Sequence, residues 1–278
     1  MSEYLVSTII PNYNNAPYIK DCVYSLLSQS YSNVEIIITD DASTDGSQEV
    51  IAQLVSEHAN VHALYNRHNI GITRNRKNAL QTAKGEYVNY LDSDDYIQNQ
   101  DKLKAEMEII HYYRDKYDED ILAFSDIAIA NGKGEIVNRF RDIKPVKEGY
   151  ITAELMTRRC LIPQNFTFRR HLYASVGGHD ETIPFYENWD LKIRLSAKYK
   201  YVFTGVPGFV YRRHGEGLSN AHEDRHQKWV RYIAEKNLAL INHDDQPMIK
   251  RWIEQMLLQL GDELDFINGH LQKQGVQQ

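Results

Sequence analysis

Several features that would place a protein outside the ordinary globular class are missing from this sequence. Of its 278 residues only two are cysteines, Cys22 and Cys160, and they have no metal-ligand spacing, so we expect two buried thiols and no disulfide. No apolar run approaches the length of a membrane span, and the first residues lack the basic-then-apolar pattern of a signal peptide. These absences predict a cytoplasmic protein, and they leave room for peripheral contact with the inner face of a membrane.

The sequence also has fewer positively charged residues than negatively charged ones. The formal net charge is −6 and the sequence has no long basic run, which argues against a nucleic-acid partner. With 42% hydrophobic residues, a chain of this length can bury one sizeable core, with a small appendage. We therefore expect a globular protein that does not bind nucleic acid.

The first third of the chain alternates β-branched runs with amphipathic stretches. The runs at 5–10, 34–39 and 61–65 are rich in Val, Ile and Leu and predict strands. Residues 17–28 and 47–55 place apolar side chains at three- and four-residue steps, the spacing of a buried helix face. The alternation predicts an α/β protein with a parallel sheet, in which ligands bind beyond the carboxyl ends of the strands.

An apolar run, Tyr87 to Leu91, ends abruptly in Asp92-Ser93-Asp94-Asp95. Clustered carboxylates repel one another, so three of them at a strand end predict a hard divalent cation, Mn²⁺ or Mg²⁺, of the kind that also binds substrate phosphates. The alternative is a polar turn that caps a helix beginning near Tyr96. The acidic stretch 40–47 and the loop 11–15 follow other predicted strands, so all three segments should converge on one pocket.

Five motifs in a fixed order resemble the family 2 glycosyltransferases. The likeness runs from about Val6 to Ser219, and it is carried by Val6–Asn14, Asp40–Asp45, Gly71 with Arg76, Lys84–Tyr87 and Leu91–Asp95. The resemblance implies the GT-A fold, a Rossmann-like and mostly parallel sheet flanked by helices. It also implies inverting, metal-dependent transfer from a nucleotide diphosphate sugar, with UDP the commonest nucleotide.

The resemblance also assigns roles at the donor site. The ring of Tyr13 offers a stacking face to the base, Asp41 can accept from a uracil N–H, and Asp92 or Ser93 would lie near the ribose. The metal would be held by Asp94 and His214. The full donor set that it implies is Pro11, Tyr13, Asn14, Asp41, Arg76, Asp92 and Ser93, with Arg212 or Arg213 as a diphosphate clamp.

The predicted helix near residues 184–195 departs from the family pattern. The family usually carries Glu-Asp here, with the Asp as the general base that deprotonates the acceptor hydroxyl, whereas this chain has Glu187-Asn188. A neutral amide cannot act as a base. Three explanations remain open: Glu187 or Asp190 supplies the base, Asn188 is an engineered replacement, or the chain binds donor without efficient transfer. Asp190 also suits a purely structural place, a first-turn carboxylate favoured by the helix dipole.

We expect a GT-A domain over residues 1–220 and a helical segment over 221–278. Within the domain, about 1–97 would bind the nucleotide sugar and 98–220 would form the acceptor side, where 141–163 carries no recognised motif. Apolar stripes in the last segment, such as Trp252, Met256 and Leu260, predict packing on the domain or in a homodimer.

The expected function is transfer of one sugar to a hydroxyl of a glycan or lipid-linked glycan, in cell-surface polysaccharide or glycoconjugate synthesis. Two other classes are weighed against it. One is a catalytically silent subunit that binds a nucleotide sugar, which only Asn188 favours. The other is a sugar nucleotidyltransferase, which would share the sheet and the metal but would need a Gly-rich, basic first loop that is not present.

Overall fold

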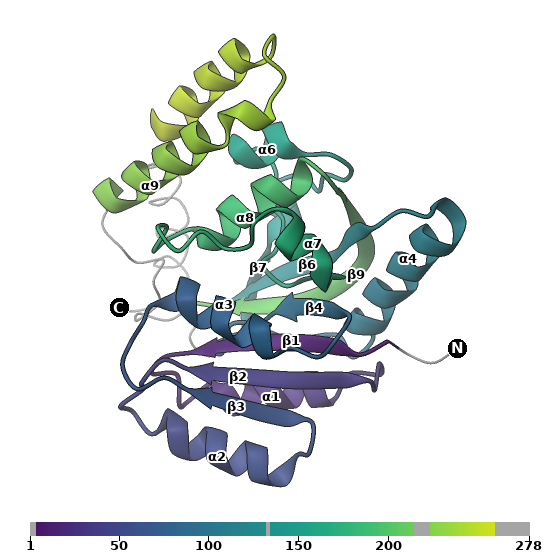
Figure 1. The fold of residues 1–278 in the computed structure, drawn as a ribbon, viewed down its shortest axis with the longest axis vertical. Coiled ribbons are helices and arrows are strands. Elements are labelled where there is room, and N and C mark those ends of the chain that lie inside the picture. Colours follow the sequence, from purple (N-terminus) through teal and green to yellow (C-terminus); the bar gives the residue numbers. More distant parts are fainter. Residues whose placement is uncertain (1–3, 132–133, 214–222, 259–278) are drawn as a thin grey trace.

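The computed structural model describes residues 4–131, 134–213 and 223–258 (Figure 1). The chain begins with three strand–helix repeats, as the alternating patterns predict. They are β1 (Val6–Asn12), α1 (Ile19–Leu27), β2 (Val34–Asp40), α2 (Ser47–Glu57), β3 (Val61–Tyr65) and α3 (Ile72–Thr82). Next come β4 (Tyr87–Tyr90), β5 (Tyr96–Ile97), α4 (Lys102–Tyr117), β6 (Ile121–Ala130) and β7 (Ile136–Arg139).

The second half is more irregular and mixes short helices with two further strands. Its elements are α5 (Phe140–Ile143), α6 (Thr152–Met156), β8 (Phe166–Arg169), α7 (Arg170–Ser175), α8 (Glu187–Ser196), β9 (Lys200–Arg212), α9 (Glu223–Lys236) and η2 (Leu238–Leu240). Residues 246–258 form one more helix. None of the described helices is both long enough and apolar enough to cross a membrane.

In the described part of the chain the strands form one nine-stranded sheet with the order β3-β2-β1-β4-β8-β6-β9-β5, and β7 pairs with β6. Strands β1 to β4 are parallel to one another. Because β8 is antiparallel to both β4 and β6, β6 runs in the same direction as β4, and β9 is parallel to β6. The predicted mostly parallel, helix-flanked α/β sheet is confirmed, with β8 as an inserted antiparallel strand.

Helices cover both faces of the sheet, because successive strand side chains point to opposite sides. Ile9 and Ile37 belong to the core under α3 and α6 to α9, whereas Val6, Ile10 and Ile36 belong to the core under α1, α2 and α4. Figure 1 shows α3 crossing in front of β1 while α1 lies behind β2. A sheet buried on both faces leaves its strand ends as the natural place for polar chemistry.

The carboxyl ends of β1, β2 and β4 meet at one edge of the sheet. Asn12 is in register with Asp40 across β1 and β2, and Ile9 is in register with Tyr90 across β1 and β4. At the start of β4 the chain passes so close to β1 that a Cβ on Gly85 would lie under 3.0 Å from Ser7 atoms. Only glycine fits there, which explains the Lys-Gly-Glu step before the strand.

The C-terminal helices pack on the domain and share its core. Val230 and Ile233 of α9, together with Ile249 and Ile253 of the last described helix, lie in the same hydrophobic cluster as Leu191 of α8. The predicted apolar stripes therefore pack against the domain, in one cluster with α8, as far as the described residues extend.

Candidate active site

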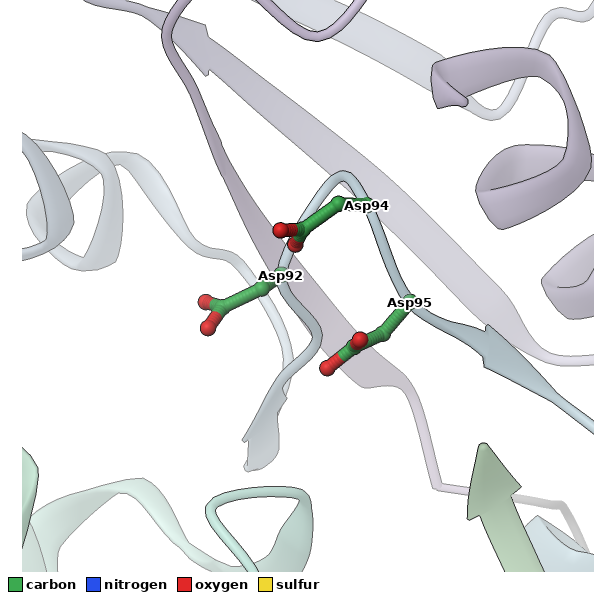
Figure 2. A group of neighbouring side chains, drawn as sticks. All are labelled: Asp92, Asp94 and Asp95. Atoms are coloured by element: carbon green, nitrogen blue, oxygen red, sulfur yellow. The ribbon is translucent and has the colours of Figure 1, made fainter. Parts of the chain in front are cut away.

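The turn between β4 and β5 carries three carboxylates, Asp92, Asp94 and Asp95 (Figure 2). Their ligand oxygens lie within 4.8 Å of one another. Asp95 is fully buried, and one of its oxygens accepts the backbone N–H of Arg212 at 2.9 Å. The other oxygen has no hydrogen-bond partner in the described part of the molecule. Burial, followed by the charges of Asp94 and Asp92, raises the pKa of Asp95 well above its usual range.

These residues fit a divalent cation. A buried carboxylate oxygen without a donor is an acceptor that an ion would satisfy, and the ion would compete with the proton that the raised pKa favours. Asp94, the ligand predicted from sequence, lies beside it. The sequence did not single out Asp95, although it stands in the same acidic run, because nothing in the sequence tells which of three neighbouring carboxylates is buried. His214, the other predicted ligand, lies outside the described residues.

Asp92 is held by two side chains from distant parts of the sequence. One of its oxygens accepts from the guanidinium of Arg76 and the other from the amide of Gln164. The Arg76 side chain, only 3% exposed, also forms an ion pair with Glu187 at the start of α8. Burial opposes the charge of Arg76, but Asp92 and Glu187 outweigh it and raise the pKa of Arg76. Arg76 thus joins the acidic turn to the helix that carries the catalytic candidates.

Asn188 takes part in a second connection between the same two elements. Its amide donates to the Oε1 atom of Gln164 at 3.2 Å, and its Oδ1 atom lies 3.0 Å from Nε2 of His179. The backbone N–H of His179 donates to the hydroxyl oxygen of Tyr173, whose proton is then directed to Nδ1 of the ring at 3.0 Å. Nε2 therefore carries the hydrogen and donates to Asn188.

The environment keeps His179 neutral. Burial lowers the pKa of this histidine to about 3. Uncharged donors and acceptors then alternate from Tyr173 through His179 and Asn188 to Gln164, whose amide donates to the carboxylate of Asp92. An amide at 188 satisfies both neighbours, whereas a carboxylate there would face the carbonyl oxygen of Gln164.

The two candidate bases have different surroundings. Glu187 is 6% exposed and contacts Arg76, next to the acidic turn. Asp190 is completely buried and each of its oxygens already has two donors, Arg194 at 2.9 and 2.7 Å on one, Lys236 at 3.0 Å and Asn237 at 2.8 Å on the other. Asp190 therefore joins α8 to α9, and the geometry favours Glu187 as the reactive carboxylate.

The predicted donor loops converge at the ends of β1, β2 and β4. Ser93 is buried and its hydroxyl accepts from Asn15 of the β1 loop at 2.8 Å. Asn14 has a left-handed backbone (φ 54°), and its backbone N–H donates to the hydroxyl oxygen of Ser43, in the loop after β2, at 2.9 Å. Tyr13 is 49% exposed, which leaves its ring accessible for stacking. Pro11 is buried within β1.

Asp41 organises the loop that leads into α3. One of its oxygens accepts from the side chain of Asn66 and the backbone of Ile70, and the other from the backbone of Gly71, each at 2.9 Å. A carboxylate has about four acceptor positions, so one remains for a ligand N–H.

Of the two predicted diphosphate residues, Arg212 has little freedom to reach a ligand. Its guanidinium lies over the rings of Tyr18 at 4.8 Å and Tyr96 at 5.2 Å, and it contacts Asp21 at 3.4 Å. Arg213 follows it in the chain and donates its backbone N–H to Ala130. This placement favours Arg213 for the clamp.

A cavity of about 350 Å³ opens beside Asp92. Its walls come mainly from α8, from β9 and from residues 140–164, most of which lie in the stretch 141–163 that carries no recognised motif. They are formed by Asp92, Ile127, Phe140, Lys144, Leu155, Arg158, Cys160, Leu161, Ile162, Gln164, Tyr186, Trp189, Lys192, Phe209 and Tyr211. The acidic turn thus lies between the strand-end loops on one side and a roomy pocket on the other.

Comparison with known proteins agrees with this geometry. Residues 7–118 match the family Glycosyl transferase family 2. The chain is 37% identical over 129 residues to the glycosyltransferase GlyG of Streptococcus pneumoniae, which covers 43% of this chain and 42% of GlyG. It is 29% identical over 231 residues to the poly(ribitol-phosphate) beta-glucosyltransferase of Bacillus spizizenii, which covers 78% of this chain and 34% of that protein.

The fold is similar to that of TarS 1-349 from S. aureus, solved in complex with UDP-GlcNAc. The TM-score is 0.68 at 19% sequence identity, and the likeness covers 91% of this chain and 71% of that one. The chain spans about two fifths or less of the length of the two curated relatives named above.

Proposed function

We propose that this chain, which belongs to glycosyltransferase family 2, is an inverting, metal-dependent enzyme that moves one sugar from a UDP-sugar to a hydroxyl of a glycan acceptor. The observation that carries the proposal is the buried Asp95 oxygen without a partner among the described residues, in a turn that also holds Asp92 and Asp94. This turn lies at the carboxyl ends of parallel strands, where such sheets bind ligands.

In this proposal Asp94 and Asp95 hold the ion. Bound there, Mn²⁺ or Mg²⁺ would supply Lewis-acid stabilisation of the leaving diphosphate. Tyr13 would stack on the base, and Asp41 would use its remaining acceptor position for the uracil N–H. The UDP-GlcNAc complex of the TarS fragment, which shares the fold, supports a nucleotide-sugar donor.

Glu187 is proposed as the base that takes the acceptor proton. Through Arg76, Glu187 is linked to the acidic turn. The oxygens of Asp190, in contrast, already accept from Arg194, Lys236 and Asn237. Removal of the proton lets the acceptor oxygen attack the anomeric carbon from the face opposite the leaving group, which inverts its configuration. Arg76 keeps Glu187 in position for this step.

The same proposal extends to partners and location. We place the enzyme in the cytoplasm, at the inner face of the membrane, where it would extend a glycan or lipid-linked glycan for cell-surface polysaccharide. Dimerisation through the C-terminal helices also belongs to this proposal. Both named relatives are glycosyltransferases, and one acts on a poly(ribitol-phosphate), which supports a role in cell-surface synthesis.

The test is nucleoside diphosphate release from a panel of UDP-, GDP- and dTDP-sugars with Mn²⁺. We expect release from one UDP-sugar, at a rate that rises when an acceptor is added. Release from a GDP- or dTDP-sugar alone would overturn the choice of nucleotide.

A catalytically silent subunit is the second candidate, and Asn188 is the residue that favours it, because the family usually has a base there. Its signature would be tight UDP binding without transfer or hydrolysis by the wild-type chain. The neutral hydrogen-bonded surroundings of Asn188 argue instead that the amide has a positioning role and that the base lies elsewhere.

A further inference from the structure

The cavity beside Asp92 is unexpectedly rich in positive charge. Its charged lining residues are Asp92, Lys144, Arg158 and Lys192, in a chain whose formal net charge is −6. The single carboxylate among them already accepts from Arg76, which it shares with Glu187, and from Gln164. Three cations therefore line the cavity together with one carboxylate that is already hydrogen-bonded.

Arg158 and Lys192 lack a carboxylate partner within the described ranges. The guanidinium of Arg158 donates to the hydroxyl of Tyr186 at 3.4 Å, and the ammonium of Lys192 donates to the backbone oxygen of Ile162 at 2.7 Å. Neither forms an ion pair with a described residue. A partly buried cation without a counter-ion is costly, and burial lowers the pKa of Lys192 to about 8.

The backbone at two of these positions is strained. Arg158 (φ 53°) and Tyr186 (φ 68°) adopt the left-handed conformation that non-glycine residues rarely take. The Arg158 guanidinium lies 5.6 Å from the centre of the Tyr186 ring, and both residues line the cavity. Backbone strain of this kind gathers at ligand sites, where the fold holds a side chain in one place.

The rest of the wall suits a sugar. Phe140, Trp189, Phe209 and Tyr211 are aromatic lining residues, a residue type on which the apolar face of a sugar ring can pack. A cavity of about 350 Å³ falls in the ordinary size range of small-ligand sites. The lining therefore combines sugar-binding surface with an unmatched positive charge.

We propose that Arg158 and Lys192 bind an anionic group, a phosphate or a carboxylate, carried by the acceptor, and that the cavity thereby selects charged glycans over neutral ones. The inference rests on the proposed glycosyl transfer, because it assigns the cavity to the acceptor. Lys192 has two further N–H donors beyond the one given to Ile162, and Arg158 has a planar fork that matches either anion.

The experiment uses the full chain with UDP and Mn²⁺ and three matched oligosaccharides that differ at one position, which bears a hydroxyl, a phosphate or a carboxylate. Calorimetry gives the dissociation constant of each. We expect at least one anionic oligosaccharide to bind about tenfold or more tightly than the neutral one, since a charge-assisted hydrogen bond is worth about that factor. The phosphate and carboxylate arms identify which anion is preferred.

Two variants test whether Arg158 and Lys192 cause the preference for the anionic oligosaccharide. Lys192→Met and Arg158→Gln should each weaken binding of the anionic oligosaccharide about tenfold, with less than a twofold change for the neutral one. Lys104→Met and Arg251→Gln, which alter exposed cations on other helices, should change neither. Equal binding of the three oligosaccharides, failure of the anionic ones to bind, or an equal loss for all three in the variants would overturn the inference.

The same calorimeter separates this inference from the proposed function. A titration of UDP with Mn²⁺ tests the donor site alone, and both pocket variants should retain the wild-type dissociation constant for UDP. Normal UDP binding without anion selectivity would contradict the acceptor inference and leave the proposed function standing. Loss of UDP binding in the wild-type chain would contradict the function itself.

Discussion

Nε2 of His179 lies 3.0 Å from Oδ1 of Asn188, and it donates its hydrogen to that oxygen. This contact explains why residue 188 is an amide: the side chain accepts from His179 and must also donate to Gln164, and an amide can do both. His179 has its pKa lowered to about 3 by burial, so it stays neutral across the working range of pH. Position 188 therefore needs a side chain that accepts from neutral His179 and donates to Gln164, which a carboxylate base cannot do.

Asn188→Asp should fail to increase activity. The new carboxylate would face the carbonyl oxygen of Gln164, and an unsatisfied or repelled buried group costs about 1–3 kcal/mol of folding free energy. Chemical denaturation and a transfer assay measure both effects, with Asn242→Asp as an exposed control. A more active and equally stable variant would mean that this chain carries a disabled base at 188.

Glu187→Gln should lower kcat about 10²- to 10⁴-fold, the usual contribution of a general base. The amide keeps an acceptor for Arg76, so the fold and the KM for the donor should change little. Steady-state kinetics with circular dichroism checks this, and Glu49→Gln on the surface of α2 is the matched control. Wild-type kcat in Glu187→Gln would remove Glu187 from the mechanism.

Asp190→Asn should act on stability. Removing the charge leaves Arg194 and Lys236 without their buried partner, and breaking a buried ion pair costs about 3–5 kcal/mol. Urea unfolding should show this loss, while the folded fraction keeps most of its kcat. If kcat falls 10²-fold in a variant that stays folded, Asp190 is the base and our assignment is wrong.

Metal binding should depend on pH in a defined direction. The pKa of Asp95 is raised in the folded protein, so its proton competes with the cation, and Mn²⁺ affinity should increase as pH rises. In the metal-free protein, folding stability should change with pH in the opposite direction to Mn²⁺ affinity. The folded chain binds this proton more tightly than the unfolded chain, so stability should fall as pH rises above the ordinary carboxyl pKa.

Asp95→Asn separates the two effects. The variant should lose Mn²⁺ binding and also lose this part of the pH dependence of Tm in the metal-free protein. Calorimetry with Mn²⁺ and thermal unfolding between pH 4 and about 8 measure them. Unchanged Mn²⁺ affinity in Asp95→Asn would show that the buried oxygen is not a ligand.

Acceptor binding should weaken in alkaline solution. Burial lowers the pKa of Lys192 to about 8; Arg158 and Arg76 also lower it, and Cys160 and Glu187 raise it. The ammonium must be protonated to bind an anion, so affinity for the anionic oligosaccharide should fall as pH rises through about 8. The Lys192→Met variant should lack this step in the same titration, and a wild-type profile that stays flat would contradict the assignment.

The fold and the donor loops could be predicted because their signals are local. Strand and helix periods place Asp41 after β2 and Asp94 after β4, the two strands that flank β1, and a parallel sheet brings their carboxyl ends to one edge. The ion pair between Arg76 and Glu187 spans 111 residues, and no local pattern encodes it. The role of Asp190 likewise depends on Lys236, the last residue of α9, and on Asn237, which follows it.

The lining of the cavity was hidden for the same reason. Arg158 and Lys192 line one cavity because α8 and the stretch before β8 fold around it, and in the sequence each alone resembles an ordinary surface cation. The buried state of Asp95 also arises from a distant partner, the backbone of Arg212 at the end of β9. Sequence therefore located the acidic turn, while packing decided which of its carboxylates can serve a metal.

The most direct test of the central claim is sugar transfer before and after removal of divalent metal. With a UDP-sugar, an acceptor and Mn²⁺, we predict transfer that falls to background in excess chelator and returns when Mn²⁺ is added back. The Asp95→Asn variant should stay at background throughout. Turnover that is unchanged by the chelator would contradict the metal-dependent mechanism proposed for this acidic turn.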